Sequence, residues 1–253
     1  MSRVAIKAVV AAFLWVALAT VALAQSPGPL QGKVFGSGNA ALVVVLHGDL
    51  SSGGQATYHF DITKRIASAN RNVTVMAMIR PGYSGGSGLK SRGSNNNRSD
   101  HYTKRNNTLV AQTIQNMAQQ IGTSKIIGVG HSGGAAQLGG VLGLAPGLLD
   151  STILVSCPCD IGKWRSMRGR SPWTKSASQS PHRQISRIAN GTRLLLVVGT
   201  RDDNTSVVLS QDYAAAAQAR GLSAQLITVN GAGHGFNKLQ STVLKTVNAE
   251  LRR

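Results

Sequence analysis

The stretch IIGVGHSGGA, residues 126–135, decides how the rest of the sequence is interpreted. Its second half, GHSGG, matches the pattern G-x-S-x-G around Ser132. Such a run could be a buried strand that ends in an ordinary flexible turn. It could also present the serine on a strained strand-to-helix turn, where flanking bulky side chains would collide with the strand and the helix. The second interpretation requires a strand before the motif and a helix after it.

Apolar runs recur along the chain at long spacing and predict buried strands. The runs are continuous rather than alternating, which indicates burial on both faces and is typical of a parallel sheet covered by helices. The predicted strands lie within residues 41–49, 73–82, 125–134, 151–158, 193–203 and 224–235.

Helical patterns lie between these strands. The alternation of strand and helix predicts right-handed crossovers and a doubly wound α/β fold, with a mostly parallel sheet and helices on both faces. The chain has 253 residues and no internal repeat, so we expect a single domain over residues 25–253. The predicted helices lie within residues 58–70, 102–122, 134–146, 207–221 and 241–253.

Residues 1–24 have the pattern of a secretory signal peptide. Arg3 and Lys7 supply positive charge, an apolar run covers residues 8–24, and Ala-Leu-Ala before Gln25 fits the cleavage rule for small residues. The alternative is an uncleaved membrane anchor, for which the run is at the short limit. We expect cleavage, no stable membrane insertion afterwards, and a secreted or periplasmic protein.

The chain is strongly basic, with 27 Lys and Arg against 9 Asp and Glu and a net charge of +18. Such a charge serves solubility, or it attracts anionic cell-surface polymers or anionic substrates. Aromatic residues make up only 4% of the chain, and no zinc-finger or basic-region pattern is present. We therefore expect no nucleic-acid partner.

Two polar, basic inserts follow predicted strands, at residues 83–101 and at about residues 161–190. Both leave the carboxyl ends of strands, the edge at which open α/β sheets form their ligand crevice. The second insert lies in a stretch without acidic residues between Asp160 and Asp202. It forms either a basic rim that contacts substrate or a solvated loop. The arginines that we expect in the rim are Arg165, Arg168 and Arg170.

A serine hydroxyl is a weak nucleophile unless a histidine, oriented by a carboxylate, removes its proton. His234 follows the last predicted strand in NGAGHGF, and Asp202 follows the fifth in VVGTRDDNTS. Together with Ser132 they give the order serine, acid, histidine, which is expected for this architecture. All three residues stand at carboxyl ends of strands, so the fold predicts that they meet at one edge of the sheet.

The segments LHGD, RPGYSGGS, GHSGG, GTRDD and GAGHGF resemble, in this order, landmark segments of the α/β-hydrolase superfamily. The resemblance covers about residues 35–253 and implies a catalytic triad of Ser132, Asp202 and His234 with a minimal cap. The acid of this superfamily usually follows the pattern G-x-x-D, which favours Asp202 over its neighbour Asp203 and over Asp160.

The same resemblance implies an oxyanion hole, which needs fixed hydrogen-bond donors. One donor is the backbone N–H of Gly133, directly after the nucleophile. The other is the backbone N–H of Asp49, in the loop after the first predicted strand. The Asp49 carboxylate is unfavourable beside an oxyanion unless it points away or pairs with a cation.

Cys157 and Cys159 are the only cysteines. Their spacing just allows a disulfide, two free thiols are an alternative, and a zinc site would lack ligands. No pair of histidines has metal-ligand spacing, and no phosphate-binding glycine loop is present. We therefore expect no cofactor and no metal.

The sequence predicts a serine hydrolase that acts through an acyl-enzyme, most simply on carboxylic esters. A serine peptidase acting on short peptides is an alternative, because GTRDDN also resembles the acid segment of prolyl-oligopeptidase-like enzymes. A third is a non-catalytic basic protein that binds anionic cell-surface material. The substrate in the first two cases is small and, given the rim, anionic.

Overall fold

The computed structural model describes residues 28–98, 101–173 and 178–253. The predicted signal peptide therefore lies outside the described residues. Among the residues that are described, no helix combines the length and the apolarity that crossing a membrane requires.

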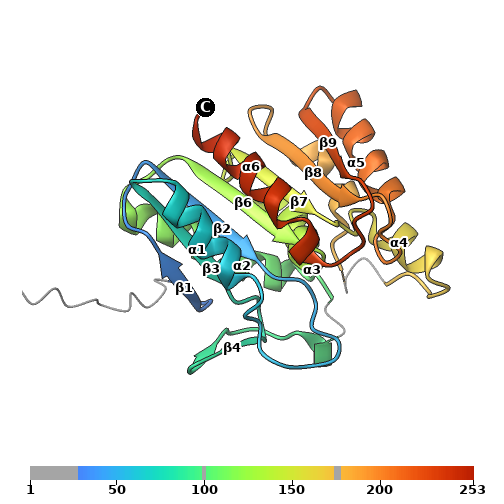
Figure 1. The fold of residues 1–253 in the computed structure, drawn as a ribbon. Helices are drawn as coiled ribbons and strands as arrows, with labels where there is room; N and C mark the ends of the chain where they lie inside the picture. The colour runs from blue at the N-terminus through green and yellow to red at the C-terminus, as the bar shows by residue number, and fades with distance from the viewer. Residues whose placement is uncertain (1–27, 99–100, 174–177) are drawn as a thin grey trace, which may run out of the picture.

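The described residues form a seven-stranded sheet with the strand order β1-β3-β2-β6-β7-β8-β9 (Figure 1). All neighbouring strands are parallel except β1, which pairs antiparallel with β3 at one edge. The strands are β1 (Gly32–Phe35), β2 (Ala41–Leu46), β3 (Val73–Met78), β6 (Ile126–His131), β7 (Ser151–Val155), β8 (Arg193–Gly199) and β9 (Ser223–Val229). The six predicted strands are thus present. The short strand β1 was not predicted, and it forms in the segment before β2, which is rich in proline and glycine.

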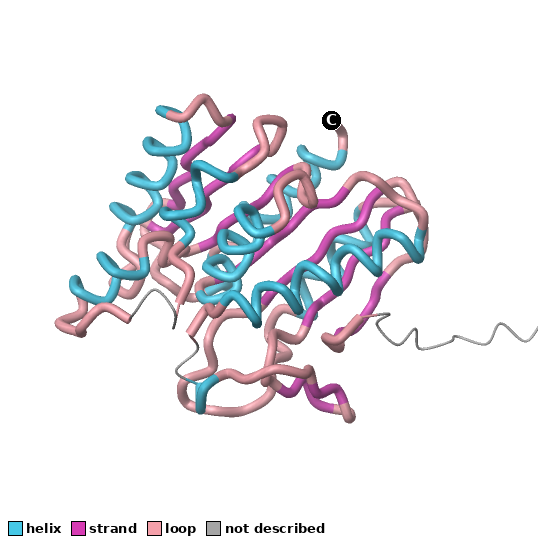
Figure 2. The backbone as a smooth tube through the Cα atoms, turned by 180° about the vertical axis from the view of Figure 1, so that it is seen from behind, coloured by secondary structure: helices cyan, strands magenta, loops and turns pink. Residues whose placement is uncertain are grey.

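Helices cover both faces of this sheet. On one face lie α1 (Phe60–Ala69) and α6 (Gln240–Leu251), in front of the sheet in Figure 1. The opposite face, seen from behind in Figure 2, carries α2 (Lys104–Ile121), α3 (Gly133–Leu144) and α5 (Val207–Ala219). This arrangement, together with the structural similarities described below, confirms the predicted α/β fold.

The side chains of each central strand alternate between two apolar cores. In β2, Val43 and Val45 point towards α1 and α6, whereas Leu42 and Val44 point towards α2 and α3. All four side chains are fully buried, and each such burial contributes about 1.5–3 kcal/mol relative to exposure. The continuous apolar runs in the sequence follow from this burial on both faces.

The two inserts form small additions at the carboxyl edge of the sheet. The first contains the hairpin of β4 (Ser84–Gly86) and β5 (Leu89–Lys90), followed by the 3-10 turn η1 (Asn96–Arg98). The second contains α4 (Ile161–Met167) and the 3-10 helix η2 (Pro181–Arg187), neither of which the sequence predicts.

Cys157 and Cys159 form a disulfide directly after β7, and both residues are fully buried. Of the states that the sequence leaves open, the structure therefore contains the cross-link. Asp160 follows it and caps α4, because its carboxylate accepts a hydrogen bond of 3.1 Å from the backbone N–H of Lys163. The third acid candidate thus has a structural role at the start of the helix.

Candidate active site

Ser132 occupies a strained turn between β6 and α3. Its φ of 53° lies in the left-handed region, which residues other than glycine rarely adopt. The flanking glycines leave room for this turn. A Cβ atom at Gly130 would lie 2.5 Å from the Gly134 carbonyl oxygen, and one at Gly134 would lie 2.5 Å from that of His47. The strand, turn and helix required by the G-x-S-x-G interpretation are therefore present.

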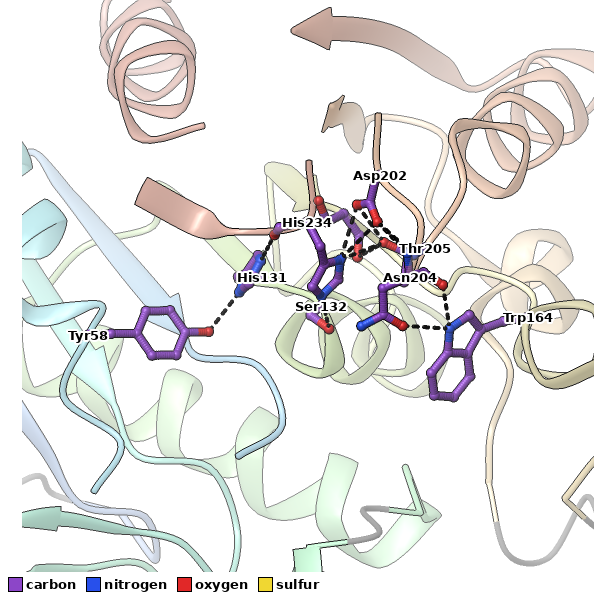
Figure 3. Close-up of polar contacts among 9 residues, drawn as sticks. Tyr58, His131, Ser132, Trp164, Asp202, Asn204, Thr205 and His234 are labelled. Carbon is purple, nitrogen blue, oxygen red and sulfur yellow. Dashed lines mark hydrogen bonds and ion pairs between the residues drawn. The ribbon is translucent and has the colours of Figure 1, made fainter. Parts of the chain in front are cut away.

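His234 and Asp202 meet Ser132 at this edge of the sheet (Figure 3). The Nε2 atom of His234 lies 3.1 Å from Ser132 Oγ, and its Nδ1 atom lies 3.0 Å from Asp202 Oδ2. The loops after β6, β8 and β9 thus bring the three predicted residues into a continuous chain of hydrogen bonds. Asp203 is exposed and does not take part in this chain.

The Asp202 carboxylate is held by its own loop as well as by His234. Its Oδ1 atom accepts hydrogen bonds from the backbone N–H groups of Asn204, at 3.0 Å, and Thr205, at 2.8 Å. Burial raises the pKa of Asp202, but the hydrogen bond and charge of His234 and the Thr205 N–H outweigh it and hold that pKa below its usual value. Asp202 is therefore ionised at neutral pH and able to orient an imidazole.

The residues predicted for an oxyanion hole lie together next to Ser132. Gly133 begins α3, where backbone N–H groups point away from the helix without intrahelical acceptors. The Asp49 carboxylate lies so close that a Cβ atom at Gly133 would be 2.1 Å from its Oδ1 atom. A carboxylate in this position is unfavourable beside an oxyanion unless it pairs with a cation, and this one does. Its Oδ1 atom lies 2.8 Å from Arg80 Nη1. The Tyr102 hydroxyl donates to the other oxygen at 2.8 Å.

Arg80 is a site residue that the sequence analysis missed. Its side chain is fully buried, and it donates to Gln137 Oε1 at 2.6 Å in addition to Asp49. Its Nη1 atom also lies 3.3 Å from the carbonyl oxygen of His47. The sequence offers one signal for this role, a lone arginine close after the apolar residues of a predicted buried strand. A guanidinium that is buried there requires a carboxylate partner, so Arg80 could have been predicted to pair with an acidic residue.

His131, the variable residue of the G-x-S-x-G motif, connects three loops of the site (Figure 3). The Gly48 N–H donates to the Tyr58 hydroxyl, and that oxygen lies 2.7 Å from His131 Nδ1. The other ring nitrogen lies 3.0 Å from the carbonyl oxygen of His234. Burial and the neighbouring His234 lower the pKa of His131 to about 3, so the ring is neutral. It therefore donates from Nε2 to the carbonyl and accepts at Nδ1 from Tyr58.

A cavity of about 870 Å³ opens over Ser132 and His234. Both inserts contribute to its walls, and all three arginines predicted for the rim line it. The Trp164 indole N–H donates to the carbonyl oxygen of Asn204 at 3.0 Å, so α4 is attached to the loop that carries Asp202 (Figure 3). Residues of the second insert that line the cavity are Trp164, Arg165, Arg168, Arg170 and Trp173.

Across the described ranges, no group of three or more His, Cys, Asp or Glu side chains is arranged to hold a metal ion. The chemistry available at this edge of the sheet is that of a serine, an imidazole and a carboxylate.

Comparison with protein families gives a match to the prolyl oligopeptidase family over residues 58–252. The chain belongs to the prolyl oligopeptidase family. This membership confirms the predicted relation to the α/β-hydrolases, and the residues matched include all three side chains of the hydrogen-bonded chain described above. Comparison with curated proteins gives no match.

Solved structures share the fold of this family member at low sequence identity. The esterase PF2001 of Pyrococcus furiosus matches with a TM-score of 0.66 and 18% identity, covering 88% of this chain and 86% of its own. A monoacylglycerol lipase of Paleococcus ferrophilus gives 0.62 and 15%, covering 87% and 99%. The propionate-bound esterase Est2 of Thermogutta terrifontis gives 0.64 and 15%, covering 87% and 88%. Such likeness shows the fold, and together with the family match it indicates that this chain is a serine hydrolase.

The buried histidines predict that the protein loses stability in mild acid. Burial is the main cause that lowers the pKa of His47 well below 6.5 and the pKa values of His59 and His131 to about 3. Between pH 6.5 and 3 the unfolded chain therefore binds more protons than the folded one, and the free energy of unfolding decreases as the pH falls. Each histidine contributes up to about 1.4 kcal/mol per pH unit.

Urea unfolding between pH 7 and pH 5 measures this effect. The variant His59→Gln should show a shallower dependence of the free energy of unfolding on pH than the wild type. A stability that does not change over this range would contradict the neutral state of the three rings.

The connection through His131 predicts a role for the Tyr58 hydroxyl. In Tyr58→Phe, the Gly48 N–H and His131 Nδ1 lose their partner, and a buried unsatisfied polar group costs about 1–3 kcal/mol. We expect a fluorophosphonate probe to modify Ser132 about tenfold more slowly. The control Tyr213→Phe removes a fully buried hydroxyl on α5 and should react at the wild-type rate. Equal rates for the two variants would show that Tyr58 does not position the site.

Proposed function

We propose that this chain is an exported serine esterase in which Ser132, His234 and Asp202 hydrolyse carboxylic esters through an acyl-enzyme. The observation that carries the proposal is the hydrogen-bond chain itself. His234 lies 3.1 Å from the serine oxygen on one side and 3.0 Å from an ionised carboxylate on the other. This is the geometry that activates a serine hydroxyl.

In the first half-reaction, His234 Nε2 takes the proton of Ser132 as Oγ attacks the carbonyl carbon of the ester. The negative charge on the former carbonyl oxygen is stabilised by the backbone N–H groups of Gly133 and Asp49. The tetrahedral intermediate then collapses and the bond to the leaving oxygen breaks. His234 returns its proton to that oxygen, so an alcohol leaves and an acyl-serine remains.

In the second half-reaction, water takes the place of the alcohol. His234 accepts a proton from water as the water oxygen attacks the acyl carbon, and the second intermediate releases the acid and restores Ser132. Asp202 holds the imidazole in the tautomer that presents Nε2 to the serine and stabilises its charged form. The neutral His131 adds no opposing charge beside the imidazolium.

The wall of the cavity favours esters over short peptides. The α-amino group of a short peptide is cationic and needs a free carboxylate partner. Among the described residues that line the cavity, Asp49 is the only acidic one, and it already pairs with Arg80. Three arginines line the same cavity. The names of the structural neighbours, two esterases and a lipase, point in the same direction. The name of the family keeps peptide hydrolysis as the second candidate.

Covalent labelling tests the proposed triad. A fluorophosphonate probe should modify wild-type protein at Ser132, and Ser132→Ala should abolish labelling and lower kcat by about 10⁴-fold or more. Ser51→Ala, which changes another serine of the same cavity, should leave labelling intact. Asp202→Asn should lower kcat by about 10⁴-fold, because the imidazole loses its orienting acceptor. Asp203→Asn, at the exposed neighbour, should behave as wild type.

A parallel set of p-nitrophenyl esters and aminoacyl p-nitroanilides then separates the two candidate reactions. Ester hydrolysis without anilide hydrolysis supports the proposal, and the reverse preference establishes the peptidase. Absence of labelling in folded protein would contradict both.

Export is supported by two features: the signal pattern of residues 1–24 and the Cys157–Cys159 disulfide, which persists in oxidising compartments. Expression of the whole chain in a bacterial host with a periplasm should give a mature protein that begins at Gln25. The mass of the intact protein from the periplasmic fraction measures the cleavage. A product that keeps Met1 and remains with the membranes would indicate an anchor instead.

A further inference from the structure

One wall of the cavity combines aromatic rings with positive charge. It comes from α4 and the segment after it, and from the end of the first insert. We call this surface the Arg–Trp wall. Its residues are His101, Trp164, Arg165, Arg168, Arg170 and Trp173, all of which line the same cavity as Ser132 and His234.

Within the part of the chain that the structure describes, no acidic side chain pairs with the arginines of the Arg–Trp wall, Arg165, Arg168 and Arg170. Burial, and to a smaller extent the like charge of the adjacent Arg170, lower the pKa of Arg165. The nearby Lys163 differs, because it pairs with Asp212. An anion bound at the wall would therefore relieve a repulsion within the cavity.

The aromatic part of the wall holds one of these charges in place. The Arg165 guanidinium lies 4.3 Å from the ring centroid of Trp173, and its Nε atom donates to the Ser171 carbonyl at 2.6 Å. Among the described residues, no hydrogen bond engages the terminal Nη atoms of Arg165, so their donors are available to a ligand. His101 lies 4.3 Å from Trp173 on centroids, and Trp164 packs edge-to-face at 6.2 Å. Rings and guanidinium thus form a preorganised surface for an aryl group that carries a negative charge.

The Arg–Trp wall is also fixed relative to the catalytic groups. The Trp164 indole N–H donates to Asn204, two residues after Asp202, at 3.0 Å (Figure 3). A group that packs on Trp164 is therefore held in a constant position relative to the loop that orients His234.

We propose that the Arg–Trp wall is a specificity subsite for esters that carry an aromatic ring with an ionised acid group, such as monoesters of aromatic dicarboxylic acids. The ring packs on Trp164 and Trp173, and the carboxylate pairs with Arg165, Arg168 and Arg170. The ester carbonyl is then presented to Ser132. This inference rests on the proposed esterase function for its role in catalysis, but binding at the wall is measurable without turnover.

Tryptophan fluorescence reports on the wall directly, because Trp164 and Trp173 are the only tryptophans after residue 24. The probe is terephthalate, which has no ester bond to be cleaved, and it is added to mature Ser132→Ala protein so that no ligand in the series can react with the serine. We expect saturable quenching by terephthalate, with binding at least about tenfold weaker for benzamide, which lacks the charge, and for succinate, which lacks the ring. Equal binding of all three, or none, would overturn the proposal.

Two sets of variants separate the effect of charge at the Arg–Trp wall from the effect of the protein's net charge. Arg168→Gln/Arg170→Gln changes two exposed side chains, and Arg165→Gln removes the guanidinium that lies over Trp173. Each should weaken terephthalate binding about tenfold through loss of charge-assisted hydrogen bonds. Arg71→Gln, at the opposite edge of the sheet just before β3, removes one charge at a distance and should bind as wild type. If Arg71→Gln weakens binding equally, net charge rather than a subsite is responsible, and the proposal fails.

Kinetics on matched esters connects the subsite to catalysis. Monomethyl terephthalate and methyl benzoate carry the ring on the acyl side, and carboxyphenyl acetate and phenyl acetate carry it on the alcohol side. In at least one pair, the ratio of kcat/KM for the charged over the neutral ester should fall about tenfold in the Arg168→Gln/Arg170→Gln variant. Unchanged ratios in both pairs would overturn the subsite even if all four esters are hydrolysed. Fluorescence binding without hydrolysis of any ester would instead contradict the esterase and leave the wall as a binding site.

Discussion

The positive φ of Ser132 is the constraint on which the geometry of this site depends. The turn between β6 and α3 is tight enough that Cβ atoms at Gly130 and Gly134 would overlap with backbone atoms. In particular, Gly134 lies against the backbone of Leu46 and His47, at the end of β2. The start of α3 is therefore held against the start of the loop after β2, which contains Asp49. The strained turn at Ser132 thus fixes the separations among three parts of the site: the serine hydroxyl, the positive N-terminal end of α3 and the loop that contains Asp49.

The electrostatics around that turn are arranged so that charge is paired wherever it is buried. Arg80 would be costly in the core by itself, and Asp49 compensates its charge at 2.8 Å. The same pairing explains why a carboxylate is tolerated beside Gly133, where an unpaired one would oppose an oxyanion. Around His234 the arrangement differs: Asp202 is ionised, and His131 remains neutral because burial lowers its pKa. The His234 imidazole thus lies beside the negative charge of Asp202, and its other neighbour, His131, carries no positive charge.

The sequence predicts the sheet, its helices and the meeting of Ser132, Asp202 and His234, for one physical reason. Continuous apolar runs mark buried parallel strands, and parallel strands end at the same edge, so residues after three such runs must approach one another. The contacts of Arg80 could not be predicted in this way, because Asp49 and Tyr102 are distant in sequence and reach it only through loops. Helix α4 was not predicted, because its seven residues are too few to show a helical period in the sequence. The disulfide was undecided because the spacing of its cysteines fits several states.

The division between fold and inserts has a consequence for substrate choice. The elements that hold the triad are strands and helices of the central core, whereas the Arg–Trp wall comes from the two inserts. A wall built on inserts would ordinarily be loosely placed relative to the catalytic atoms. Here the hydrogen bond from Trp164 to Asn204 joins the two parts. Binding energy gained by a distant aryl carboxylate can therefore orient the ester carbonyl at Ser132 rather than only retain the molecule, and energy used in this way increases kcat as well as affinity.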